Sequence, residues 1–128
     1  MAGVSISGFS FIRNGVSLGF PFIESIRSLL PLVDEFVIAV GRSDDDTLAR
    51  IQALGEPKIR IIETMWNEHM GDRGFVYAQQ KMIAQYACTG QWAFYLEGDE
   101  VLHEGELAAI RASVERHHDN PAVEALVF

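Results

Sequence analysis

The sequence predicts an α/β fold with a mainly parallel sheet flanked by helices, and two observations support this prediction. Strand patterns and helix patterns alternate along the 128 residues, which is typical of parallel strands joined by crossover helices. Two apolar runs, at 36–40 and 92–96, contain no polar residue. Runs of this kind are typical of strands that helices cover on both faces.

The first predicted strand covers 4–12 and ends at the polar, turn-permissive loop 13–15. A helix is predicted over 22–30, because its apolar residues recur at helical spacing, and Pro31 closes it. The second predicted strand is the apolar run at 36–40. These elements form the first strand–helix–strand unit of the expected sheet.

An acidic turn then leads into a second predicted helix, which extends to Leu54. Its N-cap could be Ser43, Asp44 or Asp45, since short polar side chains accept hydrogen bonds from the first free N–H groups of a helix. Gly55 and Pro57 follow the last helical residue, as expected at a helix end. A third strand is predicted over 58–63.

The second half of the chain is predicted to contain a loop at 64–72, a helix at 73–88, the strand at 92–96 and a helix at 103–118. In the last helix Leu107, Ile110 and Val114 are expected to face inward. In the helix over 73–88, the larger side chains near helical spacing are Phe75, Gln79, Met82, Ile83 and Tyr86.

Residues 123–128 are predicted to begin another buried strand, because five of the six are apolar. We expect residues 1–128 to form a single domain, since this length allows one hydrophobic core. An apolar strand with nothing to cover it indicates the N-terminal part of a longer chain, truncated at the C-terminus. An exposed strand at this position would favour a homodimer or a missing C-terminal half.

Composition excludes some classes of function and location. The net charge of −8 argues against a nucleic-acid partner, which normally requires a basic face. The single cysteine, Cys88, excludes an internal disulfide and is compatible with a reducing compartment. No apolar stretch approaches the roughly 20 residues that span a bilayer, and no signal peptide is evident. We expect a cytoplasmic protein, with peripheral contact with the inner membrane left open.

Three acidic residues, Glu97, Asp99 and Glu100, follow the apolar run at 92–96. Acids at the carboxyl end of a buried strand lie where open α/β sheets bind their ligands. Glu97 and Asp99 would project to the same side if the extended geometry continues. Such oxygen donors favour Mg²⁺ or Mn²⁺, with water and phosphates completing the coordination. The alternative is that these acids start the next turn and cap a helix.

Three stretches, in this order and at these intervals, resemble one enzyme family. Residues 11–14 (Phe-Ile-Arg-Asn) resemble the end of its first strand, residues 40–47 its Asp-rich second loop, and residues 94–100 (Phe-Tyr-Leu-Glu-Gly-Asp-Glu) its strand ending in Asp-x-Asp-Glu. The family is the family 2 glycosyltransferases, and the similarity is to the nucleotide-sugar-binding half of their GT-A fold, which is Rossmann-like. The resemblance extends over essentially the whole chain.

The resemblance implies a metal-assisted site at the acidic motif. Asp99 matches the acid that coordinates a divalent cation, Mg²⁺ or Mn²⁺, bridging the donor's diphosphate. Glu97 matches the acid that often contacts the donor sugar or ribose. Glu100 matches a commonly acidic position, whose residue could instead support the motif or start a helix. His103 follows the motif and is kept as a further candidate ligand.

The resemblance also implies a donor site around two loops and one helix. Arg13 and Asn14 match the loop that approaches the nucleotide base, although a turn asparagine and a solvated arginine are equally plausible. Arg73 begins the helix that approaches the diphosphate, or it is an ordinary surface arginine. Gly41 aligns with the family's base-contacting aspartate, so the resemblance does not imply a uridine donor. Trp66 is interpreted as a packing residue in a loop that could flank the donor.

The expected function is therefore transfer of a sugar from a nucleotide-diphospho-sugar donor to the hydroxyl of an unknown acceptor. The general base that this reaction requires is expected beyond Phe128, so the catalytic residue is unknown. One alternative is a catalytically inactive nucleotide-sugar-binding or assembly module of the same fold. Another is a nucleotidyltransferase, which would need a longer glycine-rich first loop than residues 13–15 provide.

Overall fold

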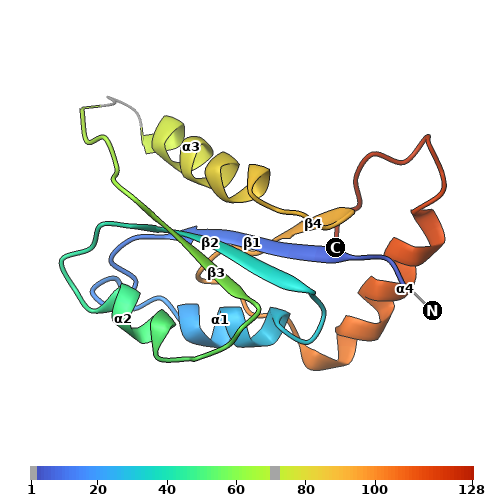
Figure 1. Cartoon of the computed structure of the whole chain (residues 1–128), viewed down its shortest axis with the longest axis horizontal. Coiled ribbons are helices and arrows are strands. Elements are labelled where there is room, and N and C mark those ends of the chain that lie inside the picture. Colours follow the sequence, from blue (N-terminus) through green and yellow to red (C-terminus); the bar gives the residue numbers. More distant parts are fainter. Residues whose placement is uncertain (1–2, 70–72) are drawn as a thin grey trace.

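The computed structural model describes residues 3–69 and 73–128, and it contains one four-stranded sheet in the order β3-β2-β1-β4 (Figure 1). Every neighbouring pair of strands is parallel. The strands are β1 (Ile6–Ile12), β2 (Glu35–Gly41), β3 (Ile59–Thr64) and β4 (Trp92–Tyr95). The helices are α1 (Phe22–Leu29), α2 (Thr47–Gln52), α3 (Arg73–Tyr86) and α4 (Leu107–His117), with a short 3-10 turn, η1 (Glu104–Glu106), before α4. The predicted α/β fold is confirmed.

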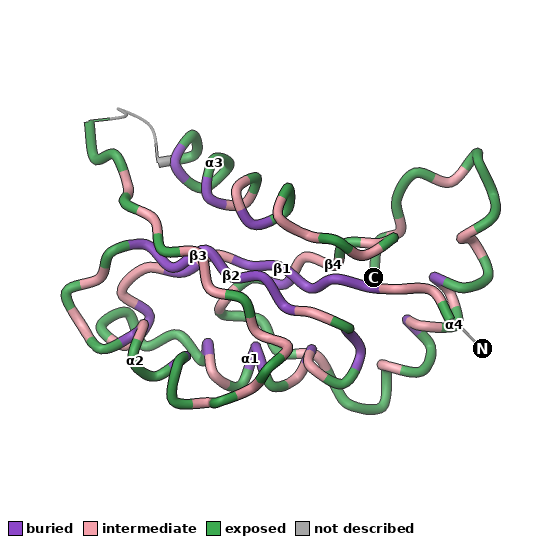
Figure 2. Tube along the Cα trace, viewed as in Figure 1, coloured by how far each residue is buried: buried purple, intermediate pink, exposed green. Residues whose placement is uncertain are grey.

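Helices cover both faces of the sheet, as Figure 1 shows: α1 and α2 lie on one face and α3 lies on the other. A large hydrophobic cluster joins the first face to α1, α2 and α4, and includes Ile6, Ile26, Ile51 and Ile110. A smaller cluster lies under α3 and includes Phe9, Val37 and Ala84. The two central strands, β1 and β2, are consequently the most buried part of the chain (Figure 2).

The strand order reverses at β1. The chain proceeds from β1 to β2 to β3 on one side, and then returns so that β4 pairs with β1 on the other side. Ligands of open α/β sheets bind at such a switch point, outside the carboxyl ends of the strands. Here that position lies between the end of β1, at Ile12, and the end of β4, at Tyr95.

Two predictions about apolar segments are wrong. β4 is not buried on both faces, because Ala93 is exposed and Trp92, Phe94 and Tyr95 are only half-buried. Residues 123–128 form no strand, and the Val127 side chain is 97% exposed. This segment instead packs beside β4, where the Phe128 ring stacks on the Phe94 ring at 6.1 Å between centroids.

Helix α3 buries a different face from the one that its large residues indicate. Phe75, Met82 and Tyr86 are exposed, whereas the helix buries Val76, Gln80 and Ala84. The small Ala84 lets the helix approach the sheet closely. The Gln80 side chain is held by a hydrogen bond from Thr64 Oγ1 at the end of β3.

The inward face predicted for α4 is confirmed. Ile110 and Val114 of α4 are buried, and Leu107 packs against the same cluster. Within the described part of the chain, no helix is long and apolar enough to cross a membrane.

Candidate functional site

A pocket of about 690 Å³ opens at the switch point, at the carboxyl edge of the sheet. Its walls come from the end of β1 and the loop after it, the loop after β3, one face of α3, and the end of β4 with the turn that follows. Its lining residues are Phe11, Ile12, Arg13, Asn14, Leu18, Phe20, Trp66, Glu68, Tyr77, Ala78, Lys81, Tyr95, Glu97, Gly98 and Asp99.

The acidic end of the pocket is a tight turn at residues 97–100. Glu100 N donates to the Glu97 carbonyl at 3.0 Å, and the Glu100 carboxylate accepts from Glu97 N at 2.9 Å. Ser25 of α1 also donates to the Glu97 carbonyl, at 3.0 Å. The turn is therefore fixed from within and from the helix beneath it. The carboxylates of Glu97 and Asp99 make no hydrogen bond or ion pair with any described residue, so their oxygens are free for a ligand.

The negative charge of the acidic turn affects the ionisation of the neighbouring Tyr95. The pKa of the Tyr95 hydroxyl is raised, first by burial and then by the negative charges of Glu97, Glu100 and Asp99. The ammonium of Lys81, on α3, lies 4.1 Å from the centre of the Tyr95 ring. Lys81 and Arg13 are the two cationic side chains among the described residues that line this pocket. Both lie where they could offset the charge of an anionic ligand.

Four aromatic rings form another wall of the pocket. Phe11 lies between Tyr77 and Tyr95, with ring centroids at 5.8 and 6.5 Å. Tyr77 meets Trp66 edge-on at 5.5 Å. The Arg13 guanidinium lies 5.2 Å from the centre of the Trp66 ring and pairs with Glu68. The pocket thus combines free carboxylates, cations and flat apolar surfaces.

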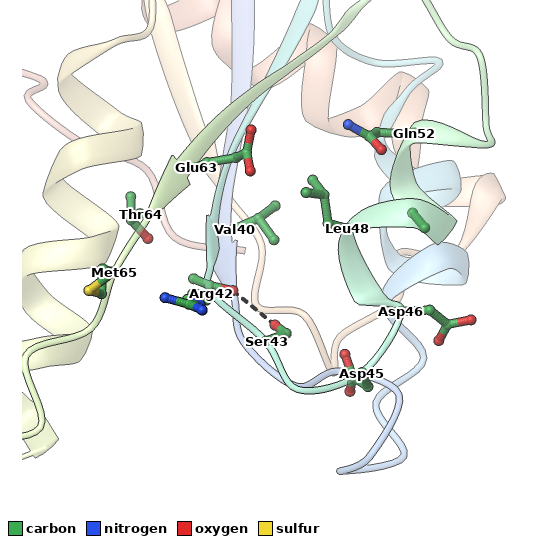
Figure 3. Close-up of a pocket in the computed structure, with 12 residues that line it drawn as sticks. Val40, Arg42, Ser43, Asp45, Asp46, Leu48, Gln52, Glu63, Thr64 and Met65 are labelled. Atoms are coloured by element: carbon green, nitrogen blue, oxygen red, sulfur yellow. Dashed lines mark hydrogen bonds between the residues drawn. The ribbon is translucent and has the colours of Figure 1, made fainter.

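Hydrogen bonds join the loop after β1 to the loop after β2. Asn14 has a left-handed backbone, with φ of 53°, a conformation that asparagine tolerates better than most residues. Its Oδ1 accepts from Asp44 N at 2.8 Å, and its own N donates to Ser43 Oγ at 2.9 Å. Ser43 Oγ in turn donates to the Gly41 carbonyl at 2.8 Å, the dashed line in Figure 3.

Asp45 adds hydrogen bonds between the loop after β1 and the start of α2. Its carboxylate accepts from Ser17 N at 2.9 Å and from the backbone and hydroxyl of Thr47. Partial burial opposes the negative charge, but these hydrogen bonds outweigh it and lower the pKa of Asp45 to about 2. The N-cap position of α2 is occupied by Asp46, whose side chain makes no capping bond. Of the three predicted N-cap candidates, none occupies that position, although Asp45 binds the N–H of the first helical residue.

A second pocket, of about 630 Å³, lies beside α2 and the end of β3. Figure 3 shows Glu63 of β3 and Leu48 and Gln52 of α2 around it. Its walls lack the aromatic cluster and the acidic turn of the switch-point pocket. We regard the switch-point pocket as the candidate site.

The structure brings together four of the seven predicted site residues. Arg13, Asn14, Glu97 and Asp99 all line the switch-point pocket. The remaining three are placed differently or lie outside the description.

Glu100 and His103 are used in local structure and are not in the pocket lining. Glu100 supports the acidic turn, and His103 is the N-cap of η1, where its Nδ1 accepts from Gly105 N at 3.0 Å. Arg73 begins α3, but its side chain lies outside the described residues. The described residues contain no group of three or more His, Cys, Asp or Glu side chains that could hold a metal by themselves.

Sequence reasoning did not assign Tyr77, Lys81 and Tyr95 to the site. Tyr77 and Lys81 are four residues apart on α3, so they lie on one face of that helix. This spacing can be seen in the sequence. The sequence does not show which face of α3 lies toward the carboxyl edge of the sheet.

The chain is similar in sequence to one curated protein and in structure to several solved proteins. It is 28% identical over 97 residues to an uncharacterized glycosyltransferase of Rickettsia felis, an alignment that covers 76% of this chain and 29% of that protein. The search against protein-family models found no match.

Among solved structures, the 1–349 segment of S. aureus TarS superposes with a TM-score of 0.66 at 18% identity, covering 89% of this chain and 33% of that one. The same segment in complex with UDP gives a TM-score of 0.65 at 19% identity. The chain thus spans a third or less of the length of the proteins it matches. These similarities confirm the predicted fold and the predicted resemblance to glycosyltransferases.

Proposed function

We propose that this chain forms the donor-binding part of a glycosyltransferase. It binds a nucleotide-diphospho-sugar, with Mg²⁺ or Mn²⁺, in the switch-point pocket, and the enzyme transfers the sugar to an acceptor hydroxyl. The observation that best supports this proposal is the pocket itself, where the unpaired carboxylates of Glu97 and Asp99 share a cavity with Arg13, Lys81 and an aromatic wall.

The similarity to TarS supports the same ligand class. In a structure of TarS in complex with UDP, 33% of that chain matches the fold of 89% of this chain. The sequence similarity to an uncharacterized glycosyltransferase points to the same reaction class.

The carboxylates fit a divalent cation that a ligand helps to hold. Mg²⁺ in nucleotide sites is commonly bound by one or two carboxylates together with substrate phosphates. Asp99 and Glu97 could supply those carboxylates, because neither is engaged by another described residue. A cation held there would offset the charge that develops on the nucleoside diphosphate leaving group.

The protein's own cations have a related role. Lys81 is held over the Tyr95 ring, and Arg13 is held over the Trp66 ring. Lys81 presents its positive charge to the pocket, whereas the charge of Arg13 is paired with Glu68. Lys81 and a bound divalent cation would together favour a diphosphate over a neutral sugar.

Isothermal titration of the chain with UDP, in the presence and absence of Mn²⁺, tests the proposal. We expect UDP to bind more tightly with Mn²⁺ than without it. Asp99→Asn should remove the metal-dependent part, a loss of about tenfold or more in affinity. Asp119→Asn is the matched control, because Asp119 is an exposed acid remote in sequence from the acidic turn.

The proposal is contradicted if no nucleoside diphosphate binds with Mn²⁺, or if Asp99→Asn and Asp119→Asn bind alike. Transfer requires an acceptor and a general base, so hydrolysis or transfer of a donor sugar is best measured on the longest natural form of the protein.

A further inference from the structure

Two serines of α1 bind the chain that follows β4. Ser25 Oγ donates to the Glu97 carbonyl at 3.0 Å, and Ser28 Oγ accepts from Leu102 N at 3.0 Å. Residues three apart in a helix lie on the same side of it, so both hydroxyls reach the same neighbouring segment. Residues 97–102, which include the acidic turn, are therefore attached to α1 at their first and their last residue.

These serines extend from a helix that the core holds firmly. Ser25 is only 2% exposed, and the Ser28 hydroxyl also donates to the Ser25 carbonyl at 2.7 Å. The apolar residues of α1 that are buried in the large hydrophobic cluster are Phe22, Ile26 and Leu29. The hydrogen bonds to residues 97–102 therefore start from a fixed base.

The bonds from α1 determine where the acidic turn lies. The two hydrogen bonds between Glu97 and Glu100 give the turn its shape, but they lie within the turn and do not place it. Among the described residues, the hydrogen bonds that join residues 97–102 to another element are those from Ser25 and Ser28. The positions of the free carboxylates of Glu97 and Asp99 consequently depend on α1.

Helix α1 also follows the opposite wall of the pocket. Residues 13–21 connect β1 to α1, and the lining residues that they contribute are Arg13, Asn14, Leu18 and Phe20. One helix is thus continuous with the loop after β1 and hydrogen-bonded to the acidic turn. It sets how far the free carboxylates lie from that loop.

We propose that Ser25 is a positioning residue for the divalent cation of the donor site. Its hydroxyl holds the acidic turn so that Glu97 and Asp99 meet the cation and the diphosphate at the same place. Ser25 does not line the pocket, so it acts through the turn and touches neither the cation nor the donor. This inference rests on the proposed function, and it adds a residue that supports the metal-binding carboxylates from behind.

Titration calorimetry with UDP, once with Mn²⁺ and once with EDTA, tests the inference. The ratio of the two affinities measures the metal-dependent part of binding. Ser25→Ala should lower this ratio about tenfold, as loss of a hydrogen bond behind a metal ligand typically does, and should leave the affinity in EDTA unchanged. A role in stability alone would not change the ratio, because partial unfolding lowers both affinities equally.

A double variant tests whether Ser25 acts through the turn. Residues that act as one unit have non-additive effects. With Mn²⁺ present, Ser25→Ala combined with Asp99→Asn should therefore bind UDP no more weakly than Asp99→Asn alone. Hydrogen exchange of the metal-free protein gives a second measurement, in which Ser25→Ala should reduce the protection of the Glu97 and Glu100 amides.

Ser113→Ala is the matched control, because Ser113 is a half-buried helical serine of α4 whose hydroxyl makes no hydrogen bond with any described residue. It should leave the affinity ratio and the amide exchange of the turn unchanged. Ser25→Cys keeps the shape of the side chain but donates only weakly, so its ratio should fall between those of Ser25→Ala and the wild type. This variant keeps the test informative if Ser25→Ala does not fold.

The possible failures are distinguishable. A wild-type ratio in both Ser25→Ala and Ser25→Cys overturns the positioning role while the proposed function stands. A double variant that binds more weakly than Asp99→Asn also overturns it, because the two residues would then act independently. If the wild-type chain binds no nucleoside diphosphate with Mn²⁺, the proposed function fails and the inference fails with it.

Discussion

At the scale of single residues, the carboxylates of this chain fall into two groups according to their hydrogen bonds. Glu35 accepts from Ser7, from the backbone and hydroxyl of Thr89 and from Arg60. Glu97 and Asp99 accept from no described residue. The first kind of acid stabilises the fold, and the second kind is available to a ligand. From the sequence alone, Glu35, Glu97 and Asp99 are simply acidic residues, and it cannot be predicted which of them is hydrogen-bonded within the fold.

The engaged acids predict a loss of stability in acid. Burial opposes the negative charge of Glu35, but hydrogen bonds from Ser7, Thr89 and Arg60 together outweigh it and lower the pKa from 4.5 to about 2. The pKa of Asp45 falls from 3.8 to about 2 for a similar reason. Both pKa values are lower in the folded state than in the unfolded state. The two carboxylates therefore contribute fully to the free energy of unfolding above about pH 5, and this contribution is lost as the pH falls toward 2.

Urea unfolding at pH values from 7 to 2.5 measures this loss. Glu35→Gln should lower the free energy of unfolding at pH 7 by about 1–3 kcal/mol, and the variant should lose less stability than the wild type on acidification. Asp119→Asn should keep the wild-type pH dependence. A Glu35→Gln profile that parallels the wild type would contradict the assignment.

At the scale of elements, the sequence predicts which segments are helices and strands better than it predicts how they face. The pattern of α1 predicts its position almost to the residue, because its apolar residues all face one large cluster. The pattern of α3 is misleading, because its largest apolar residues, Phe75 and Tyr86, are exposed and its packing residue Ala84 is small. β4 is less buried than its apolar run predicts, because such a run does not show how fully helices cover the two faces of a strand.

The hydrogen bond between Thr64 and Gln80 leads to a prediction about α3. If this contact positions the helix, its loss should lower both the free energy of unfolding and the affinity for a ligand. Gln80 is buried and accepts from Thr64 Oγ1, while the pocket residues Tyr77 and Lys81 lie on the same helix. Gln80→Ala should leave a cavity and an unpaired hydroxyl, and so destabilise the fold by about 2–4 kcal/mol. Because α3 would pack less firmly, affinity for a nucleoside diphosphate should also fall.

Gln79→Ala is the matched control for this element, since Gln79 is its exposed neighbour and surface substitutions usually change stability by less than about 0.5 kcal/mol. Urea unfolding and calorimetry on both variants make the comparison. Equal stability of the two variants would show that Gln80 does not anchor α3.

At the scale of the whole molecule, strand order determines which residues meet. The alternation of strands and helices allows the parallel sheet to be predicted, and the carboxyl ends of its strands identify Arg13, Asn14, Glu97 and Asp99 as neighbours. The aromatic wall could not be predicted in this way. Its rings come from β1, the loop after β3, α3 and β4. They meet because β4 pairs with β1 at the edge of the sheet and α3 lies on the opposite face from α1.

Ligand binding at this edge should stabilise the molecule as a unit, because the pocket draws residues from both sides of the switch point. A ligand that binds only the folded state at 100 times its dissociation constant adds about 2.7 kcal/mol to the free energy of unfolding. For a domain of this size, each kcal/mol corresponds to about 3–6 °C, so the expected rise in melting temperature is roughly 8–16 °C. We therefore expect UDP with Mn²⁺ to raise the melting temperature by that amount, and EDTA to remove most of the rise.

Differential scanning fluorimetry with UDP, Mn²⁺ and EDTA in all combinations separates the contributions. Mn²⁺ alone should give a small shift, because Asp99 and Glu97 provide only part of a coordination shell and the diphosphate provides the rest. Asp99→Asn should reduce the combined shift to that of UDP alone. A full shift with Mn²⁺ alone would instead indicate a metal site that needs no nucleotide, and the cation would then belong to the fold rather than to the donor.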